Sequence, residues 1–252
     1  MLRKDRRDSD FLTTIAQIGV TTHPGGKEAT KTLFEKLDLK EGDVVLDLGC
    51  GSGRTLTFVS QSYPVKIIGV ELKSELAKEA RQRTQFARDR VIVLKGDIER
   101  LPLRDNCVDC AFSESVLNFV NKEKALSEAS RVLKREGQIA LLEITFKDKK
   151  IDRINRLARE VFQVPQFEIL TSEEWCQILK SFGFCVKSIQ QLPYWWQGTD
   201  KEEALVEARL LIGLMMRWSL RRFLLTWRLL FALTRYSAIG LYWGVKEPVS
   251  TS

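Results

Sequence analysis

Apolar residues in the first 150 positions fall in short runs separated by polar, helix-forming segments. Five runs have the length and the Val, Ile and Leu content of buried strands: 44–48, 66–70, 91–94, 108–112 and 138–144. Helices are expected between them, one starting near Thr55 and one over Lys122–Leu133. Strands covered on both faces appear as continuous apolar runs, and their alternation with helices predicts a doubly wound, mostly parallel sheet of the α/β class.

The turn after the first strand carries candidate chemistry. Asp47 lies in the strand, Gly49, Gly51 and Gly53 follow at alternate positions, and Arg54 opens the next helix. Glycines allow positive φ angles and a close approach of a ligand to the main chain, and the helix start offers unpaired N–H groups. The dinucleotide fingerprint would need a third glycine where Arg54 stands. A tight turn without a ligand and a nicotinamide cofactor site stay open at this point.

Acidic residues follow the second and third strands. Glu71 ends the second strand, and Gly96-Asp97-Ile98 follows the third. A carboxylate at the end of the second strand can accept hydrogen bonds from both hydroxyls of a ribose. Either acid taken alone is equally well explained as a solvated strand-end carboxylate. In combination with the glycine turn, the two acids indicate a nucleoside-containing cofactor.

This series of motifs resembles the class I S-adenosylmethionine (SAM)-dependent methyltransferases. The resemblance implies a Rossmann-like methyltransferase fold in which Asp47 orients the SAM ammonium through water and Glu71 binds the ribose. It also implies that Asp97 receives the adenine amino group while Ile98 packs on the ring. The expected cofactor-binding set is Asp47, Gly49, Cys50, Gly51, Gly53, Glu71, Leu72, Asp97, Ile98 and Ser113.

The family core ends with two strands that form an antiparallel hairpin and bring the sheet to seven strands. Phe184–Gln190 resembles the first of them, after a helix over Ser172–Phe182, and Ala238–Lys246 resembles the second. Roughly 45 residues separate the two, and a structureless loop of that length is uncommon in a compact domain. We therefore expect a helical cap over 191–236, a SAM-binding core over 42–190 and 237–247, and an N-terminal helical lid over 1–41.

Three residues are candidates for handling the proton of a methyl acceptor. Glu114 follows the fourth strand, where ligands bind in open α/β sheets, and is the first choice. His23 precedes a helix over Lys27–Leu37, and Tyr194 opens the cap. A base is needed only if the acceptor must lose a proton. A dipole-stabilised carboxylate explains Glu114 equally well, and a structural hydrogen bond in a turn explains His23.

The cap concentrates the positive charge of the chain. Residues 208–246 carry seven basic groups and no acidic one, and the net charge of the whole chain is +7. On a helical wheel Arg217, Arg221, Arg228 and Arg235 lie close together, with apolar residues mostly away from them. A cap that packs its apolar face on the core explains this pattern. A peripheral membrane contact through helices over 208–235 explains it too, whereas nucleic-acid binding is disfavoured because no such module is visible.

The composition of the chain also bears on its location in the cell and on metal binding. No run of apolar residues is long enough for a transmembrane helix, and the N-terminus lacks the apolar core of a signal peptide. We therefore expect a cytoplasmic protein, with contact to a membrane surface left open. Five cysteines and one histidine give no metal-ligand set beyond the isolated pair Cys107 and Cys110, so no metal site is expected. Cys50 is interpreted as a small residue that fills space.

The expected function is methyl transfer from SAM to a small or amphiphilic acceptor, such as a quinone precursor, a lipid or another hydrophobic metabolite. Two alternatives stay open on the sequence alone. One is a SAM-binding regulator or scaffold without transferase activity, held at a membrane. The other is a methyltransferase of RNA or protein.

Overall fold

The central sheet follows the predicted plan. The computed structural model of the chain describes residues 23–193 and 220–247. Strands lie in the order β3-β2-β1-β4-β5-β8-β7, with the short β6 paired to β5 beside this path. Their bounds are β1 (Val44–Leu48), β2 (Lys66–Glu71), β3 (Val91–Lys95), β4 (Val108–Glu114), β5 (Leu133–Phe146), β6 (Leu170–Thr171), β7 (Phe184–Pro193) and β8 (Ser237–Lys246). All pairs are parallel except those that β8 makes with β5 and β7.

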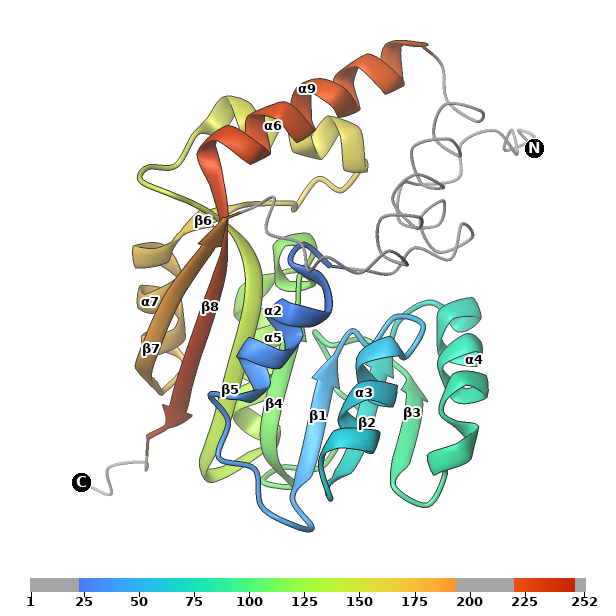
Figure 1. Ribbon diagram of the computed structural model, residues 1–252. Coiled ribbons are helices and arrows are strands. Elements are labelled where there is room, and N and C mark those ends of the chain that lie inside the picture. Colours follow the sequence, from blue (N-terminus) through green and yellow to red (C-terminus); the bar gives the residue numbers. More distant parts are fainter. Residues whose placement is uncertain (1–22, 194–219, 248–252) are drawn as a thin grey trace.

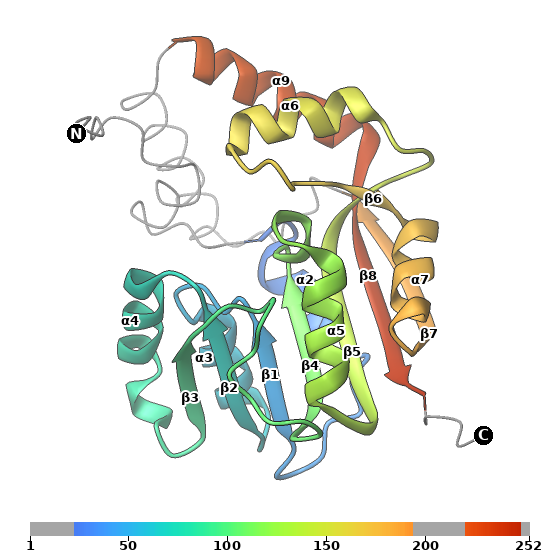
Figure 2. The same ribbon diagram turned by 180° about the vertical axis from the view of Figure 1, so that it is seen from behind.

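Helices cover both faces of the sheet (Figures 1 and 2). One core cluster joins α2, α3 and α4 to the sheet, and a second joins α5 and α7 to the opposite face. Their bounds are α2 (Gly26–Phe34), α3 (Arg54–Ser62), α4 (Ser74–Arg83), α5 (Lys122–Val132) and α7 (Ser172–Ser181). Apolar strands and two helical layers together make the doubly wound α/β architecture that the sequence predicts.

The third core cluster lies beyond the carboxyl ends of the central parallel strands. Helices α6 (Asp152–Phe162) and α9 (Leu220–Tyr236) lie side by side there, across the end of the sheet at which β1 and β4 terminate (Figures 1 and 2). Leu229 and Leu233 of α9 are buried against Ala158 and Phe162 of α6. These two helices cover the edge of the sheet where ligands bind in such folds. Because α6 lies outside the insertion 191–236, the name cap is used from here on for α6 and α9 together.

Several expectations need correction or lie outside the described residues. Strand β7 continues to Pro193, so the insertion before β8 is shorter by three residues than 191–236 implies. The two-residue β6 was not expected, because so short a strand has no periodic pattern. Helix α2, which falls within the expected lid over 1–41, packs in the first core cluster. Residues 1–22 of the expected lid and residues 194–219 of the expected cap lie outside the described residues.

Candidate active site

The glycine turn is held against the end of β2. Gly49, Gly51 and Gly53 have φ angles of 92°, 53° and 81°, and Gly53 is the N-cap of α3. The backbone N–H groups of Gly49 and Cys50 donate to the carbonyl oxygen of Val70 at 2.9 and 3.1 Å. The turn therefore has the left-handed backbone and fixed position that the three glycines predict.

Gly49 is also required by its surroundings. A Cβ atom at this position would lie 2.7 Å from Cγ2 of Val116, which belongs to the loop after β4. That distance is far below van der Waals contact. The two loops at the carboxyl edge therefore touch through the bare backbone of Gly49.

Replacing Gly49 with alanine should destabilise the protein by about 2 to 5 kcal/mol, since a left-handed alanine and an overpacked contact both contribute. Gly42→Ala is the matched control, because Gly42 has a φ of 84° but no atom within 4 Å of the added Cβ. Chemical denaturation of both variants measures the difference. Equal losses in the two would show that Val116 yields and that the contact has no structural role.

Three carboxylates converge beneath this turn. Asp47 is 3% exposed and Glu71 8%, and Glu114 ends β4, which pairs with β1 beside Asp47. Burial raises the pKa of Asp47 well above its ordinary value, and the charges of Glu114 and Glu71 raise it further. The site is thus a buried anionic cradle that favours a cationic ligand.

Glu71 fixes the glycine turn from the neighbouring strand. Its Oε2 accepts a hydrogen bond from the N–H of Gly51 at 3.0 Å, and its Oε1 accepts one from Lys73 at 2.8 Å. Burial raises the pKa of Glu71, and these backbone hydrogen bonds oppose the rise. Leu72 beside it is 61% exposed. An exposed leucine next to a ribose-binding candidate offers an apolar surface on which an aromatic base can lie.

The two residues expected at the adenine lie after β3. Asp97 is exposed, and its Oδ1 accepts a hydrogen bond from the N–H of Glu99 at 2.9 Å. Ile98 is buried in the second core cluster. Asp97 is therefore accessible to a ligand, whereas the Ile98 side chain already packs against the protein.

Glu114 and His23, predicted separately, lie together. Glu114 Oε1 accepts a hydrogen bond from the Thr30 hydroxyl at 2.7 Å, and Oε2 accepts one from Thr55 at 2.6 Å. The Nε2 atom of His23 lies 3.3 Å from Glu114 Oε1 and 3.0 Å from Thr30 Oγ1. Segments far apart in the sequence, at the starts of α2 and α3 and the end of β4, thus build one polar cluster.

Both ring nitrogens of His23 have a hydrogen-bond partner. Nδ1 lies 3.1 Å from the carbonyl oxygen of Pro24, which can only accept, so this nitrogen carries a proton. Nε2 lies within hydrogen-bonding distance of the Thr30 hydroxyl, which itself donates to Glu114 Oε1. His23 and Glu114 therefore form a pair that can exchange a proton.

The side chains of Cys50 and Ser113 point into the protein interior. Cys50 is 8% exposed and fills space beside Gly69, where an added Cβ would lie 2.8 Å from its Sγ. Burial raises the pKa of the Cys50 thiol, so it is a poor nucleophile. Ser113 is fully buried and donates to Glu143 at 3.1 Å. Any contact of these residues with a cofactor must therefore come from their backbone.

Glu143 is a residue that the sequence analysis missed. It is fully buried in β5 and accepts hydrogen bonds from Ser113 Oγ and from the N–H groups of Val116, Leu117 and Asn118 at 3.1, 3.1, 3.0 and 3.4 Å. Burial raises its pKa to about 7, against the effect of these donors. Glu143 thus holds the loop that touches Gly49. A lone acid in the apolar run 139–146 was the signal for it.

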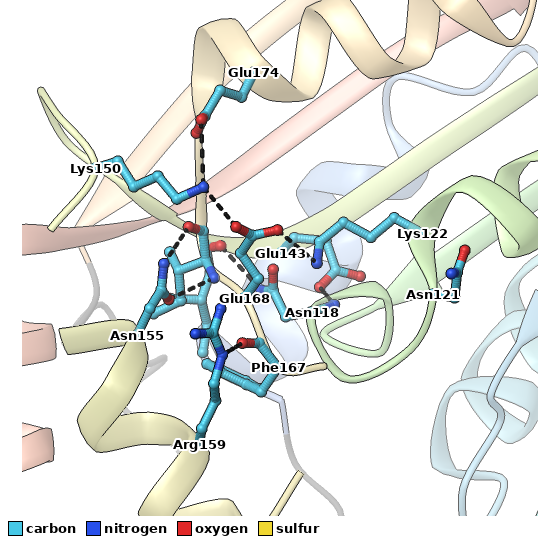
Figure 3. A network of polar contacts seen from close by, with 12 residues as sticks. Asn118, Asn121, Lys122, Glu143, Lys150, Asn155, Arg159, Phe167, Glu168 and Glu174 are labelled. Carbon is cyan, nitrogen blue, oxygen red and sulfur yellow. Dashed lines mark hydrogen bonds and ion pairs between the residues drawn. The ribbon is translucent and has the colours of Figure 1, made fainter. Parts of the chain in front are cut away.

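Further polar contacts join this loop to the cap (Figure 3). Asn155 of α6 exchanges two hydrogen bonds with the backbone of Ile169, at 2.8 and 3.2 Å. The N–H of Glu168 donates to the carbonyl oxygen of Asn118 at 3.0 Å, and its carboxylate accepts a hydrogen bond from Lys150 at 2.5 Å. The segment between α6 and β6 therefore connects the cap to the loop after β4.

The remaining predictions concern Tyr194, a metal site and membrane-spanning helices. Tyr194 lies outside the described residues. Among those that are described, no group of three or more His, Cys, Asp or Glu side chains is arranged to hold a metal ion. Cys110 is fully buried in β4, and Cys107 donates to the carbonyl oxygen of Arg104. No helix in residues 23–193 and 220–247 is long and apolar enough to cross a membrane.

The cradle distinguishes between the two cofactor classes considered for the glycine turn. A dinucleotide would bring a pyrophosphate dianion toward Asp47, whose pKa is already raised by burial and by the charges of Glu114 and Glu71. SAM brings a sulfonium and an ammonium, both cationic, with a single carboxylate. The charges of the site therefore fit SAM and oppose a dinucleotide, and the fold and site define an α/β protein that binds a cationic nucleoside cofactor.

Comparisons with known proteins give the family. A family model described as a methyltransferase domain matches residues 46–141. The uncharacterized methyltransferase YodH of Bacillus subtilis is 30% identical over 181 residues, which are 70% of this chain and 75% of that protein. The chain therefore belongs to the class I SAM-dependent methyltransferases, and SAM is its methyl donor.

Solved structures share the fold at low identity. The [4+2]-cyclase SpnF has a TM-score of 0.74 at 17% identity, covering 93% of this chain and 92% of that one. The geranyl diphosphate C-methyltransferase of Streptomyces coelicolor A3(2), solved with S-adenosyl-L-homocysteine, has a TM-score of 0.67 at 16% identity, covering 88% and 76%. These similarities concern the fold alone and leave the acceptor to be argued from the site.

Proposed function

We propose that the protein transfers the SAM methyl group to a small or amphiphilic acceptor, with the His23–Glu114 pair taking up the acceptor proton. The observation that carries the proposal is the convergence of this pair on the anionic cradle: Glu114 is close enough to raise the pKa of Asp47 and also contacts His23 at 3.3 Å. One group thus borders both the cofactor site and the only histidine of the chain.

The cofactor seat is proposed to use each part of the cradle differently. Asp47 faces the cationic end of SAM, Glu71 the ribose, and Leu72 with Asp97 the adenine. The N–H groups at the start of α3 face the SAM carboxylate, because a helix N-terminus favours an anion. Gly49, Gly51 and Gly53 keep this surface free of side chains.

When bound, SAM supplies an electrophilic methyl group on a sulfonium whose departure is intrinsically favourable. The protein therefore has two tasks: it holds the acceptor in line with the methyl group, and it removes a proton if the acceptor carries one. The Thr30 and Thr55 hydroxyls hold the Glu114 carboxylate beside His23, so the pair is positioned to take up that proton.

The acceptor side is apolar where the loop after β4 meets the cap. Phe119 of that loop packs against Phe162 and Phe167, with ring centroids 5.2 and 4.7 Å apart. An aromatic cluster at the same edge of the sheet as Glu114 suits an acceptor with one nucleophilic atom and a hydrophobic body. This supports an amphiphilic metabolite over a charged macromolecule.

Glu114→Gln and His23→Gln should each lower kcat by about 10²- to 10⁴-fold, since each removes the proton acceptor. Glu35→Gln at the exposed C-cap of α2 is the control and should retain full activity. The assay incubates the protein with methyl-labelled SAM and a native small-molecule extract, and mass analysis then identifies the labelled product.

The same assay separates the alternatives. Label in RNA or protein instead of the small-molecule fraction would contradict the proposed acceptor class. SAM binding by calorimetry without transfer to any extract would favour a regulator. Full activity in Glu114→Gln would show that the acceptor needs no base.

A further inference from the structure

Helix α9 has two apolar faces, and only one of them is used by the fold. Its inner face carries Leu225, Leu229 and Leu233, which pack with α6 in the third core cluster. On the outside Leu224, Trp227 and Phe231 are 53%, 50% and 67% exposed. Their spacing of three and four residues places them in one stripe along the helix. We call these three residues the outer stripe.

The outer stripe is unusual for this protein. Seven large hydrophobic residues are exposed among those described, and the other four lie singly on other elements: Leu72, Phe86, Ile92 and Ile189. Single exposed apolar residues are ordinary on a protein surface, whereas a contiguous row that contains Trp and Phe marks an interaction site.

A row of arginines flanks the outer stripe. Arg221, Arg228 and Arg235 are all exposed and recur every seven residues, so they follow one side of the helix. No acidic residue occurs in 220–236. The guanidinium groups of Arg235 and of Arg153 on α6 lie 5.4 and 5.9 Å from the ring of Tyr236. Cations thus cluster along the helix and at its carboxyl end.

The only ion pair that this row makes within the described residues is weak. Arg221 contacts Glu160 of α6 at 3.1 Å, but the two side chains are 82% and 50% exposed. A pair so exposed gains little from its partner, because water screens it. The arginine row therefore remains available to an external anion.

This arrangement corrects the expectation from the helical wheel. The apolar residues that the wheel places away from the arginines, such as Leu229 and Leu233, pack inside and cannot contact a partner. The available apolar surface is the narrower outer stripe, which lies next to the arginines. An apolar stripe with cations at its border is the pattern of a helix that lies in the plane of a membrane interface.

We propose that α9 docks the protein on an anionic lipid surface, with the outer stripe inserted among the acyl chains and Arg221, Arg228 and Arg235 on the phosphates. Charge complementarity selects this partner: a second copy of the chain would bring another arginine row and no carboxylate on the same helix. A helix of 17 residues is about 25 Å long, which suffices to lie flat with several anchors. The docking surface is at the end of the molecule that holds the cofactor turn (Figure 1).

The test is co-sedimentation of the full chain with vesicles of phosphatidylcholine, alone or with roughly one third phosphatidylglycerol. Binding should require the anionic lipid and weaken as salt is added. Trp227→Ser with Phe231→Ser should reduce it at least about tenfold, and Arg228→Gln with Arg235→Gln should do the same. All these residues are exposed, so circular dichroism should show unchanged folding.

Two control pairs match the changes away from α9. Phe86→Ser with Ile92→Ser removes exposed apolar residues, and Lys78→Gln with Arg88→Gln removes exposed cations. Both should bind as the parent does. Equal binding to neutral vesicles, or equal losses in test and control pairs, would overturn the proposal. So would sedimentation showing a dimer that the Trp227 variant abolishes while vesicles remain unbound. None of these outcomes depends on which acceptor is methylated.

Discussion

Replacing Asp47 with asparagine should make the ligand-free protein more stable and at the same time weaken its binding of SAM. At neutral pH the buried carboxylate is opposed by desolvation and by the charges of Glu114 and Glu71. The asparagine is nearly isosteric and uncharged, so the ligand-free fold should gain about 1 to 3 kcal/mol. The cationic end of SAM loses its counter-charge, so affinity should fall about 10- to 100-fold.

The pH dependence gives an independent check of this stability change. A carboxyl whose pKa is raised in the folded state binds more protons than in the unfolded state. Its contribution to stability is therefore lost as pH rises from its ordinary pKa of 3.8 toward the raised value. The asparagine variant lacks this loss, so its advantage over the parent should appear above about pH 4 and grow with pH.

Denaturation and calorimetry across pH measure the two effects. Asp89→Asn is the control, because Asp89 is 74% exposed and makes only a loose ion pair with Arg90 at 3.7 Å. It should change neither stability nor affinity. A less stable Asp47→Asn variant would show that the carboxylate is compensated in the ligand-free protein, and unchanged SAM affinity would remove Asp47 from the cofactor seat.

Replacing Glu143 with alanine should strongly lower the free energy of unfolding. The change leaves the Ser113 hydroxyl and three backbone N–H groups without their acceptor in a fully buried place. Each unsatisfied group costs about 1 to 3 kcal/mol, so we expect a loss of at least 4 kcal/mol and disorder of the loop after β4. Because that loop packs on Gly49, SAM binding should be lost as well.

Glu143→Gln is the matched variant, since it keeps an oxygen that can accept most of these bonds. The folded-state pKa of Glu143 is about 7, above its ordinary 4.5, so the parent loses stability as pH rises between these values. Glutamine should remove that slope while keeping the fold. Urea denaturation at pH 5 and pH 8 measures both. An equal pH slope in parent and glutamine variant would mean that Glu143 does not titrate in this range.

Local sequence patterns predicted the elements of the fold and the glycine turn that follows the first strand. Strand runs such as Val44–Leu48 and the glycine spacing after them carry their own signal, because burial on both faces and positive φ angles select particular residue types. Glu114 and His23 were each recognised by their place at a loop. Their contact was not predictable, because it depends on how the start of α2 lies against the end of β4.

Two other features depend on packing that sequence periodicity does not show. Glu143 is one acid in an apolar strand, and only the fold shows that its carboxylate meets the N–H groups of the neighbouring loop. The outer stripe of α9 follows the same helical period as the inner face. Which of the two faces is covered is decided by where α6 lies, and the wheel of α9 alone cannot show this.

The connection between α9 and β8 has a mechanical consequence for the cap. The helix ends at Tyr236 and the strand begins at Ser237, so no linker separates them. Lys147 closes the junction by donating to the carbonyl oxygens of Tyr236 and Arg235 at 3.0 and 3.2 Å. Strand β8 is then hydrogen bonded along its length to β5 and β7, with Gly240 opposite Glu143. No loop therefore separates α9 from the sheet at this end. A force applied to α9 would act directly on the hydrogen bonds between β8 and β5, the strand that carries Glu143.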